Sequence, residues 1–548
     1  MRVVPLGGLG EIGKNMMVYE TANDMIVVDS GLMFPEEEML GIDLVIPDIT
    51  YIHDNAHKLR GIFITHGHED HTGGLPYVMK ELKTNIYCTR LTRGLIAVKL
   101  KEHRLLDDST LLNVEYGESV KAGTDFEVEF FSVAHSIPDA AGLAIKTPLG
   151  IVIHTGDFKL DHTPVMGSGT DLTRLAHFGQ EGVLLLCSDS TYAELEGYTP
   201  SESVVGEALD TIIANAPGRV IVTTFASLIA RVQQVIDAAN HHGRRVFVTG
   251  RSMIDNVNMA MELGYLKSPP GGLLRVDEVR ELPPEKVCIV STGSQGEPTS
   301  ALARMANGDH QHIQIVPGDT VILSSSPVPG NEALVYRVVD NLFKLGASVL
   351  YNRISNVHVH GHASQEELKI MFGLTRPKYF VPIHGEFRHL VLHAKLAQLM
   401  GVEKENCFVL QDGDALDIRP SGAARAGKVT CDWVYVDGLG VGDVDHIILR
   451  DRKHLATDGI LVIIIAVEKQ TGRVVGRPDV VSRGFVDVEE SEELLEETRR
   501  RVVAALDGTS EHIAEWGVVN TMVKDSVAEF LYEKTRRRPM ILPVVTEV

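Results

Sequence analysis

The chain has 548 residues, of which 44% are hydrophobic, so it is long enough for about three to four domains and wholesale disorder is excluded. Its formal net charge of −22 argues against a nucleic-acid binder that works through a broad basic face, although an enzyme with a local basic groove stays open. The longest apolar run, residues 460–467, is too short to cross a bilayer, and we expect no membrane association.

The start of the chain and its cysteines bear on the cellular compartment. Residues 1–5 lack a signal-peptide pattern, and the five cysteines are scattered without a CxxC pair. This usage fits buried thiols in a reducing environment better than a disulfide framework. We therefore expect a cytoplasmic protein.

A glycine-rich stretch follows the first predicted strand, residues 2–6. Residues 8–13 spell the G-x-G-x-x-G pattern of dinucleotide-binding sites. That fingerprint requires a helix that opens at the glycines, whereas residues 15–20 and 25–29 are typical of two strands joined by a tight turn. We therefore predict a hairpin, with glycines that form tight turns near the floor of a site, and no dinucleotide.

Asp29 ends the second strand of this hairpin with a carboxylate. Two interpretations stay open: Asp29 orients a neighbouring metal-binding loop, or it caps the Ser-Gly turn that follows it. The acidic loop after it, residues 31–48, contains Phe34 and is a candidate rim of the site.

The most informative stretch is residues 65–72, with the sequence THGHEDHT, which follows an apolar predicted strand. His66 and His68 point the same way in an extended segment and can bind one metal ion together. Asp70 and His71 lie past the bend and face a second position. Imidazole and carboxylate ligands favour zinc or manganese. No thiolate is nearby, which argues against a closed structural zinc site. Four potential ligands in one short loop make a chance arrangement the weaker interpretation.

Further predicted strands end in a histidine or an aspartate. His135 follows residues 126–132, Asp157 follows residues 151–154, and Asp189 follows residues 184–188. Asp157 lies beside a glycine, where a carboxylate can reach out and bridge two cations. We predict that two nearby histidines are not ligands, because His154 lies inside its strand and His162 lies in a loop without a partner pattern.

Strands and helices alternate between residues 199 and 350. The predicted strands are 220–224, 246–249, 287–291 and 320–326, and the predicted helices include 202–214, 253–262 and 332–345. Such alternation predicts a parallel sheet with helices on both faces. Ser227 follows the first of these strands, near the start of a helix.

A second histidine cluster spans residues 358–364, with the sequence HVHGHAS. Ser364 is a candidate N-cap for a predicted helix over residues 365–373. The predicted strand 378–383 then leads directly into His384, again at a strand end.

The last part of the chain changes character. Residues 422–428 are predicted to be a linker. Beyond it we predict strands over 459–467 and 473–486, helices over 489–506 and 518–538, and a closing strand over 540–545. The first of these helices has acidic residues first and arginines 499–501 last, which matches the helix dipole.

The metal-type residues together resemble a known superfamily. The pattern of His66, His68, Asp70 and His71, then His135, then Asp157 in TGD, is similar to the metallo-β-lactamase superfamily. The resemblance implies two face-to-face sheets between outer helices, with metals at the strand ends. Ordinary members supply a last histidine soon after the bridging aspartate, whereas the next convincing candidate here is His384. The α/β segment in between resembles the β-CASP insertion of nucleic-acid-processing members.

Three more motifs narrow the family. Asp189 in CSDST, His362 in HVHGHAS and His384 in PIHGE match β-CASP motifs. With PLGGLGEIGKNM and SSSPVPGNE, the whole chain resembles the ribonuclease J family, without a departure at a metal position. The implied α/β fold is a metallo-β-lactamase αββα sandwich with an inserted β-CASP domain and a small C-terminal α/β domain. The implied boundaries are 1–198 and 351–425 for the sandwich, 199–350 for the insertion, 426–445 for a linker and 446–548 for the C-terminal domain.

The resemblance implies two Zn²⁺ ions per subunit, with Mn²⁺ or Mg²⁺ as alternative activating ions. It assigns one ion to His66, His68 and His135 and the other to Asp70, His71 and His384, with Asp157 as the bridge. A hydroxide between the ions would attack the phosphorus in line with the leaving 3′ oxygen. Asp70, Asp189 and His362 are the implied catalytic residues. His362 would contact the phosphate and protonate the leaving group, unless it only holds the loops, while Asp189 and Asp29 would orient ligand rings.

The implied activity is hydrolysis of single-stranded RNA in RNA maturation and mRNA decay, as a 5′→3′ exonuclease that prefers 5′-monophosphate ends and as an endonuclease. Small residues let backbone N–H groups meet phosphate oxygens. The candidate pocket is His358, Val359, His360, Gly361, His362, Ala363 and Ser364, with Ser227 across a cleft. Ser227 fits the start of a helix equally well. Phe34 is a candidate for base stacking. Implied partners are single-stranded RNA, a second copy of the chain through the C-terminal domain as a homodimer or higher oligomer, and other RNA-decay proteins.

Three alternatives stay under consideration. A β-CASP DNA nuclease keeps the fold, and the metal ligands do not distinguish it from an RNA nuclease. A small-molecule hydrolase predicts a last histidine soon after Asp157 and no large insertion, and both features fail. A non-enzymatic scaffold is disfavoured by the intact set of ligands.

Overall fold

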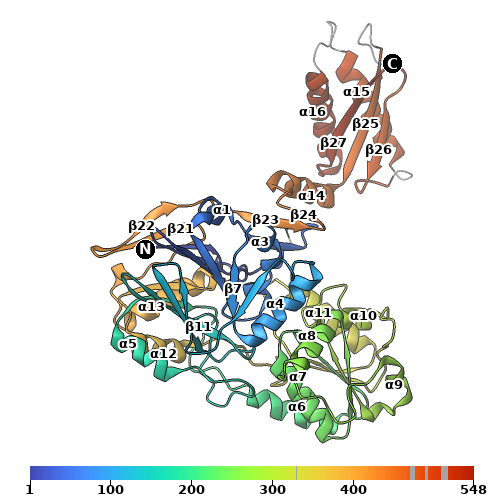
Figure 1. Ribbon diagram of the computed structural model, residues 1–548. Helices are drawn as coiled ribbons and strands as arrows, with labels where there is room; N and C mark the ends of the chain where they lie inside the picture. The colour runs from blue at the N-terminus through green and yellow to red at the C-terminus, as the bar shows by residue number, and fades with distance from the viewer. Residues whose placement is uncertain (37, 329, 469–474, 488–490, 508–515) are drawn as a thin grey trace. The chain divides into compact units, whose positions relative to one another are not determined.

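The computed structural model describes residues 1–36, 38–328, 330–468, 475–487, 491–507 and 516–548 (Figure 1). The chain forms two compact units, one of residues 1–34 and 44–434 and the other of residues 35–43 and 435–548. No helix within these described ranges is both long and apolar enough to cross a membrane.

Two β-sheets form the base of the first unit. The first sheet has the strand order β22-β21-β1-β3-β4-β6-β7-β8 and the second has the order β19-β13-β12-β11-β10-β9. The strands of the first are β1 (Arg2–Gly7), β3 (Met16–Glu20), β4 (Met25–Val28), β6 (Leu59–Phe63), β7 (Asn85–Cys88), β8 (Thr110–Asn113), β21 (Asp414–Arg419) and β22 (Gly422–Lys428). The strands of the second are β9 (Ser119–Ala122), β10 (Phe126–Ser132), β11 (Ala141–Thr147), β12 (Gly150–His154), β13 (Val183–Asp189) and β19 (Tyr379–Ile383).

The two sheets pack face to face because their strands are apolar on both sides. Val28 and Phe63 of the first sheet share a buried cluster with Phe130 and Val152 of the second. The next residue along each strand faces outward, onto helices that cover the two outer faces. The helices on the first sheet are α3 (Leu75–Glu81) and α4 (Arg90–Glu102), and those on the second are α5 (Leu172–Glu181), α12 (Gln365–Thr375) and α13 (Phe387–Leu399). This is the predicted αββα sandwich.

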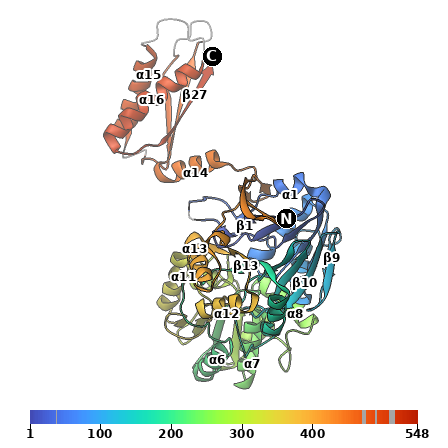
Figure 2. The same ribbon diagram turned by 90° about the vertical axis from the view of Figure 1, so that its left-hand side faces the viewer.

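A third sheet carries the predicted insertion. It is fully parallel, with the order β15-β16-β14-β17-β18. Its strands are β14 (Val220–Thr223), β15 (Arg245–Thr249), β16 (Val287–Ser291), β17 (Thr320–Leu323) and β18 (Ser348–Tyr351). Helices α6 (Ser203–Asn215), α7 (Ile229–His241) and α8 (Arg251–Glu262) cover one face, and α9 (Val276–Glu281), α10 (Ala301–Asn307) and α11 (Glu332–Lys344) the other. Helices α6 and α7 lie side by side in both views (Figures 1 and 2). The parallel sheet with two helical layers confirms the prediction from alternation.

The second unit contains a three-stranded sheet of the order β26-β25-β27. Its elements are α14 (His446–Asp458), β25 (Ile460–Val467), β26 (Asp479–Arg483), α15 (Glu492–Asp507), α16 (Trp516–Thr535) and β27 (Met540–Glu547). Leu461, Ile463 and Ile465 of β25 are buried with side chains of α15 and α16, so both helices cover one face of this sheet. The smaller elements of the chain are β2 (Leu9–Gly10), β5 (Leu44–Pro47), α1 (Thr50–Asp54), α2 (Glu69–Thr72), β20 (Gly385–Glu386), β23 (Trp433–Asp437), β24 (Gly440–Val441) and the 3₁₀ turns Ala56–Lys58, Pro284–Lys286 and Lys404–Asn406.

Several sequence predictions need correction. The predicted linker Gly422–Lys428 is strand β22, which pairs with β21 at the edge of the first sheet. Its small and basic residues hide a strand because most of its side chains are exposed. Arginines 499–501 lie inside α15, which continues to residue 507, instead of at its end. The predicted strand 473–486 and helix 489–506 each begin outside the described residues.

The predicted hairpin at the glycine-rich stretch is confirmed. Strands β3 and β4 pair antiparallel, and no helix opens at residues 8–13 in the part of the chain that the structure describes. The glycines form turns: Gly8, Gly10 and Gly13 all have a positive φ. A crossover helix, which a dinucleotide site requires, is therefore absent from this stretch.

Candidate metal centre

Parallel strands bring the candidate ligands to one edge of the sandwich. In the first sheet β4 and β6 are parallel neighbours, and they end at Asp29 and at the loop of His66. In the second sheet β12, β13 and β19 are parallel neighbours that end near Asp157, Asp189 and His384. Carboxyl ends of parallel strands meet at the same edge, which explains how residues far apart in sequence converge.

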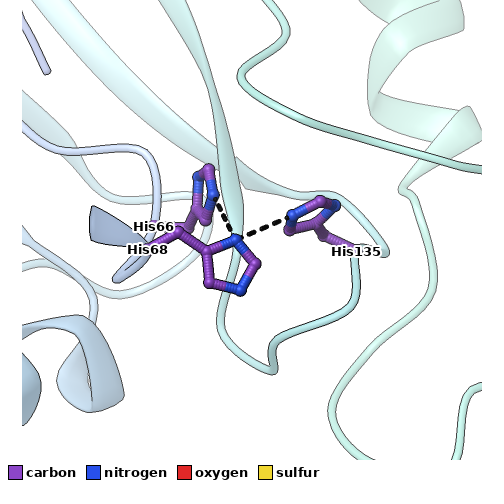
Figure 3. A group of neighbouring side chains, drawn as sticks. All are labelled: His66, His68 and His135. Carbon is purple, nitrogen blue, oxygen red and sulfur yellow. Dashed lines mark hydrogen bonds between the residues drawn. The ribbon is translucent and has the colours of Figure 1, made fainter. Parts of the chain in front are cut away.

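Three imidazole rings form the first group of neighbouring side chains. His68 Nδ1 lies 3.1 Å from His66 Nε2 and 3.1 Å from His135 Nε2. Figure 3 shows the three rings and these two contacts. Zinc at its usual distance of about 2.0–2.1 Å from each nitrogen would place tetrahedral ligand atoms roughly 3.3 Å apart. The observed spacing of these nitrogen atoms therefore fits one zinc ion.

The protonation of these three rings also favours a bound cation between them. His135 Nδ1 lies 2.8 Å from the Gly361 carbonyl oxygen, so Nδ1 carries the ring proton and Nε2 faces the group without one. Burial lowers the pKa of His66, of His135 and, to about 4, of His68, so the three rings are neutral at pH 7. One proton on His68 Nδ1 can satisfy only one of its two contacts, whereas a cation satisfies both.

Two carboxylates and two histidines form the second group. Asp70 Oδ2 lies 3.5 Å from His71 Nε2 and 3.5 Å from His384 Nε2. His384 Nε2 is buried without a hydrogen-bond partner in the described chain. A buried nitrogen that faces a carboxylate and lacks a partner fits a position that a metal ion would complete.

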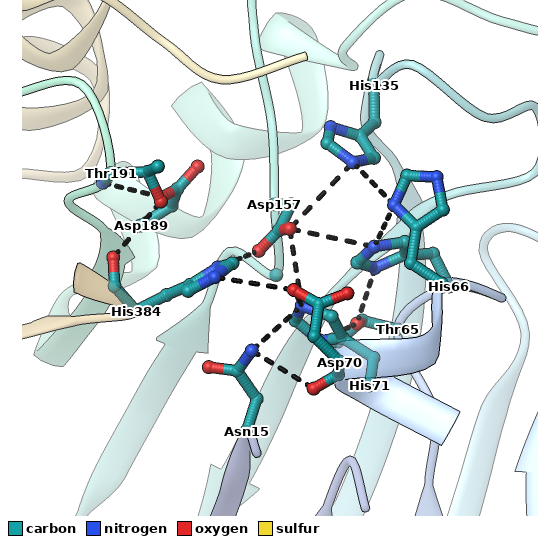
Figure 4. A network of polar contacts seen from close by, with 12 residues as sticks. Asn15, Thr65, His66, Asp70, His71, His135, Asp157, Asp189, Thr191 and His384 are labelled. Carbon is teal, nitrogen blue, oxygen red and sulfur yellow. Dashed lines mark hydrogen bonds and ion pairs between the residues drawn. The ribbon is translucent and has the colours of Figure 1, made fainter. Parts of the chain in front are cut away.

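Asp157 lies between the two groups (Figure 4). Its Oδ2 is 3.2 Å from His71 Nε2, 3.6 Å from His66 Nε2 and 3.8 Å from His135 Nε2, and its Oδ1 is 2.6 Å from His384 Nδ1. The side chain of Asp157 is buried. Burial alone would raise the pKa of Asp157, but the adjacent His384 and His71 hold it well below the usual range. An ionised carboxylate thus faces both groups.

Asp29 holds the loop of residues 65–72 through hydrogen bonds. Its Oδ2 lies 2.8 Å from His71 Nδ1, and its Oδ1 accepts the N–H of Thr65 at 2.8 Å. A carboxylate that holds one ring nitrogen turns the other toward the metal position. Of the two interpretations of Asp29, the structure therefore favours orientation of the metal loop.

His362 and Asp189 form a pair beside the centre. Asp189 Oδ2 lies 2.8 Å from His362 Nδ1, and Asp189 Oδ1 accepts two hydrogen bonds from Thr191, from its N–H at 3.0 Å and its hydroxyl at 2.8 Å. Burial would lower the pKa of His362, but Asp189 outweighs it and raises this pKa to about 9. The ring of His362 lies 5.1 Å from that of His135 and 5.5 Å from that of His384, between centroids.

Models of known families match most of the chain in four segments. The metallo-beta-lactamase superfamily model matches residues 9–190, and the ribonuclease J beta-CASP domain model matches residues 217–342. Residues 348–410 match a Zn-dependent metallo-hydrolase RNA specificity domain, and residues 447–548 match the ribonuclease J C-terminal domain.

Full-length relatives agree with these models. Ribonuclease J of Thermus thermophilus is 46% identical over 553 residues, which cover 100% of this chain and 95% of that protein. Ribonuclease J2 of Bacillus subtilis is 42% identical over 549 residues, covering 100% and 99%. The chain belongs to the ribonuclease J family. A solved structure of a protein of unknown function from Enterococcus faecalis, 16% identical, has a similar fold, with a TM-score of 0.51 over 76% of this chain and 99% of that one.

In this ribonuclease J family member, the predicted phosphate pocket divides into two parts. The N–H of Ser364 donates to Glu367 at 2.8 Å, within a capping box that starts α12, so this group is already used. The N–H groups of Gly361, His362 and Ala363 donate to no protein acceptor among the described residues. These three N–H groups are therefore candidates to meet a phosphate.

The remaining predicted contacts have other neighbours. His360 Nδ1 lies 3.0 Å from the His362 carbonyl oxygen, and its ring is stacked on Tyr192. Val359 is buried in the core of the inserted domain, and His358 has a buried Nδ1 without a partner in the described residues. Ser227 precedes α7, and its carbonyl accepts the N–H of Ile229. Within the described ranges, no side-chain hydrogen bond joins Ser227 to residues 358–364.

The histidines predicted to be non-ligands lie outside both groups. His154 is buried on β12, where its Nδ1 lies 2.9 Å from the Tyr19 hydroxyl. His162 is exposed in the loop after β12. Phe34 is 43% exposed, which leaves its ring open to a base.

Sequence reasoning missed several residues that hold the site. Asn15 donates from Nδ2 to the Asp70 carbonyl at 3.1 Å, and nothing in its sequence context indicates this. Glu367 could have been found, because Ser364 and Glu367 have the spacing of a capping box. Thr199, which lies where the chain enters the inserted domain, had no sequence signal at all.

Proposed function

We propose that this chain hydrolyses phosphodiester bonds of single-stranded RNA at a two-zinc centre, from ends that carry a 5′-monophosphate. As a member of the ribonuclease J family it is a metal-dependent ribonuclease with 5′→3′ exonuclease and endonuclease activity. The observation that carries the proposal is the position of Asp157, whose carboxylate faces both groups of potential ligands.

The proposed ligands follow the two groups. His66, His68 and His135 would hold one ion, Asp70, His71 and His384 the other, and Asp157 would contact both. Zinc bound there supplies positive charge for the phosphate and lowers the pKa of water so that it attacks at neutral pH. Metal analysis of the purified protein distinguishes zinc from manganese or magnesium as the activating ion.

His362 is the proposed proton donor for the leaving 3′ oxygen. Asp189 holds its Nδ1, so its other nitrogen is turned away from Asp189. Thr191 in turn holds Asp189, which limits the freedom of the ring. A general acid must be fixed within hydrogen-bond reach of the atom that it protonates, and this chain of contacts supports that role.

The 5′-monophosphate would bind to the three free N–H groups at Gly361, His362 and Ala363. Successive backbone N–H groups form an anion-binding concavity without the entropy cost of long basic side chains. Such a site is compatible with a chain of net charge −22, because it needs no broad basic surface. Ser227 and His358 stay candidate contacts on the side of the inserted domain.

Self-association through the C-terminal domain is the proposed assembly. In the β25–β27 pair, Val462 lies beside Leu542 and Ile464 beside Val544, on the face opposite α15 and α16. Leu542 is 48% exposed and Ile464 is 38% exposed. An exposed apolar sheet face of this kind fits an interface with a second copy.

We also propose domain boundaries at residues 198, 350, 425 and 445. The first residues of the proposed linker, 426–428, belong to strand β22.

Cleavage of end-labelled RNA tests the function. Single-stranded RNA with a 5′-monophosphate, labelled at either end, is incubated with the unsubstituted chain and with His68→Ala, beside DNA of the same sequence. We expect mononucleotides from the 5′ end of RNA, loss of cleavage in His68→Ala and after chelation, and intact DNA. DNA cleavage at the rate of RNA would instead assign a β-CASP DNA nuclease, and no cleavage of either would favour a scaffold.

A further inference from the structure

We propose that Thr199 and Glu367 are positioning residues that hold the backbone of His362 at the point where the chain enters and leaves the inserted domain. The proposal rests on the proposed role of His362 in RNA cleavage. It assigns a task to two buried polar side chains that contact no candidate metal ligand.

Glu367 joins three separate segments of the chain. Its Oε1 accepts the N–H of Leu160 at 2.7 Å, and its Oε2 accepts the N–H groups of Thr199 and Ser364, each at 2.8 Å. Leu160 belongs to the loop that carries Asp157, Thr199 to the segment leading into the inserted domain, and Ser364 to the segment returning from it. One carboxylate thus ties the bridging aspartate loop to both crossings.

The burial of Glu367 makes these three hydrogen bonds necessary for its stability in the fold. The residue is fully buried, at 0% exposure, and no lysine or arginine lies within ion-pair distance in the described chain. A buried carboxylate without a cation is costly unless hydrogen bonds to N–H groups replace its water. Simple helix caps bond only their own helix: Asp171 accepts one N–H, from Arg174 of α5, and Asp445 accepts two, from Ile447 and Ile448 of α14. Three bonds to three segments exceed what capping α12 requires.

Thr199 carries this connection to His362. Its hydroxyl donates to the His362 carbonyl oxygen at 2.8 Å and lies 3.0 Å from the Ser364 hydroxyl. Since a carbonyl only accepts, the Thr199 proton points to His362, and Ser364 donates to Thr199. The same carbonyl also receives the Nδ1–H of His360.

His362 is therefore held at two places. Asp189, at the end of β13, fixes its ring, and Thr199 fixes its backbone from the crossing into the inserted domain. Without Thr199, the His362 carbonyl would keep only its contact with His360 Nδ1, so the backbone of residues 361–363 could shift and carry its N–H groups and the ring with it. A displacement of about 1 Å at a reacting group can cost roughly 10²-fold in rate. Thr199 prevents this displacement.

The test replaces single atoms of this connection. Thr199→Val removes the hydroxyl at nearly constant shape, and Thr199→Ser restores it. Glu367→Gln removes one of the two acceptor oxygens. The matched control is Thr375→Val, because Thr375 is also buried and its hydroxyl donates to a carbonyl, that of Met371 within α12, away from His362. Each variant is measured for kcat and KM on 5′-monophosphorylated RNA, for zinc content, and for deuterium exchange of peptides spanning residues 358–364.

We expect Thr199→Val to lower kcat about 10- to 100-fold, to raise KM for 5′-monophosphorylated RNA, to leave zinc content unchanged, and to speed deuterium exchange in residues 358–364. Thr199→Ser should return kcat to near the unsubstituted value, Glu367→Gln should lower kcat as Thr199→Val does, and Thr375→Val should leave kcat unchanged. Unchanged kcat in Thr199→Val, or an equal loss in Thr375→Val, would overturn the proposal. If the unsubstituted chain cleaves no RNA, the proposed function fails, while unaltered exchange in Thr199→Val would independently refute the hold on His362.

Discussion

At the scale of single residues, two side chains of the site sit on backbone conformations that residues other than glycine rarely adopt. Asp29 has φ 62° and His384 has φ 50°, both in the left-handed region. Such conformations cost roughly 1–3 kcal/mol each and persist where the surrounding structure holds them. Close packing adds to this: a side chain on Gly31 would overlap the Asp70 carbonyl oxygen. Strain and tight packing together fix the direction of the ligand side chains.

Asp29→Asn tests the anchor of His71. Asparagine keeps the shape and tolerates the left-handed backbone, but it removes the negative charge that holds His71 Nδ1. We expect zinc affinity to fall about 10- to 100-fold, as loss of a ligand's hydrogen-bonded carboxylate usually causes. Competition with a zinc-binding dye measures it.

The control is Asp24→Asn on the preceding turn. Asp24 is equally buried and bonds Arg60 and Thr124 instead of a ligand. It should lose stability and keep zinc affinity. Equal zinc affinity in Asp29→Asn and the unsubstituted chain would refute the orienting role.

At the scale of elements, glycines set how closely two helices of an outer layer pack against each other. Helix α5 packs on α12 over the second sheet, and the contact depends on Gly179, where an added Cβ would run into the Leu374 carbonyl. For Gly373, on α12 itself, no atom of the described residues outside the adjoining helix backbone lies within 4 Å of such a Cβ. The two helical glycines therefore differ in their reason for being glycine.

Opposite effects of one substitution at these glycines test the packing. Gly179→Ala should lower the free energy of unfolding by about 1–3 kcal/mol, because backbone cannot move aside as a flexible side chain does. Gly373→Ala should raise it by roughly 0.5–1 kcal/mol, through the higher helix propensity of alanine. Thermal unfolding of both variants is the measurement, and destabilisation by Gly373→Ala would contradict the assigned packing.

At the scale of the whole molecule, the division into two units separates the metal centre from the proposed interface between copies. All candidate ligands lie in the unit of residues 1–34 and 44–434, and the exposed apolar face of β25 and β27 lies in the other. Self-association can therefore change without a change at the ligands.

Leu542→Lys tests the proposed interface, because a charge at the centre of an apolar contact must be desolvated. We expect a shift toward monomer in sedimentation velocity. Leu399→Lys is the control, since Leu399 is 80% exposed on α13 in the first unit. A Leu542→Lys variant that associates like the unsubstituted chain would place the interface elsewhere.

The sequence by itself determined the main elements of the fold and the residues that converge on the metal centre. An apolar strand followed within a few residues by histidine or aspartate is a local pattern, and it occurs at His66, His135, Asp157, Asp189 and His384. Alternating strands and helices between residues 199 and 350 likewise predict a parallel sheet without knowledge of any contact.

Only the tertiary structure decided how these residues are grouped in space and what supports them. Strand β22 is polar and is stabilised by pairing with β21, which its composition does not reveal. Thr199, Asn15 and Glu367 each make hydrogen bonds to backbone groups of segments distant in sequence, and a hydrogen bond leaves no periodic pattern. Periodicity reports burial, whereas the partner of a buried polar group depends on which segments the fold brings together.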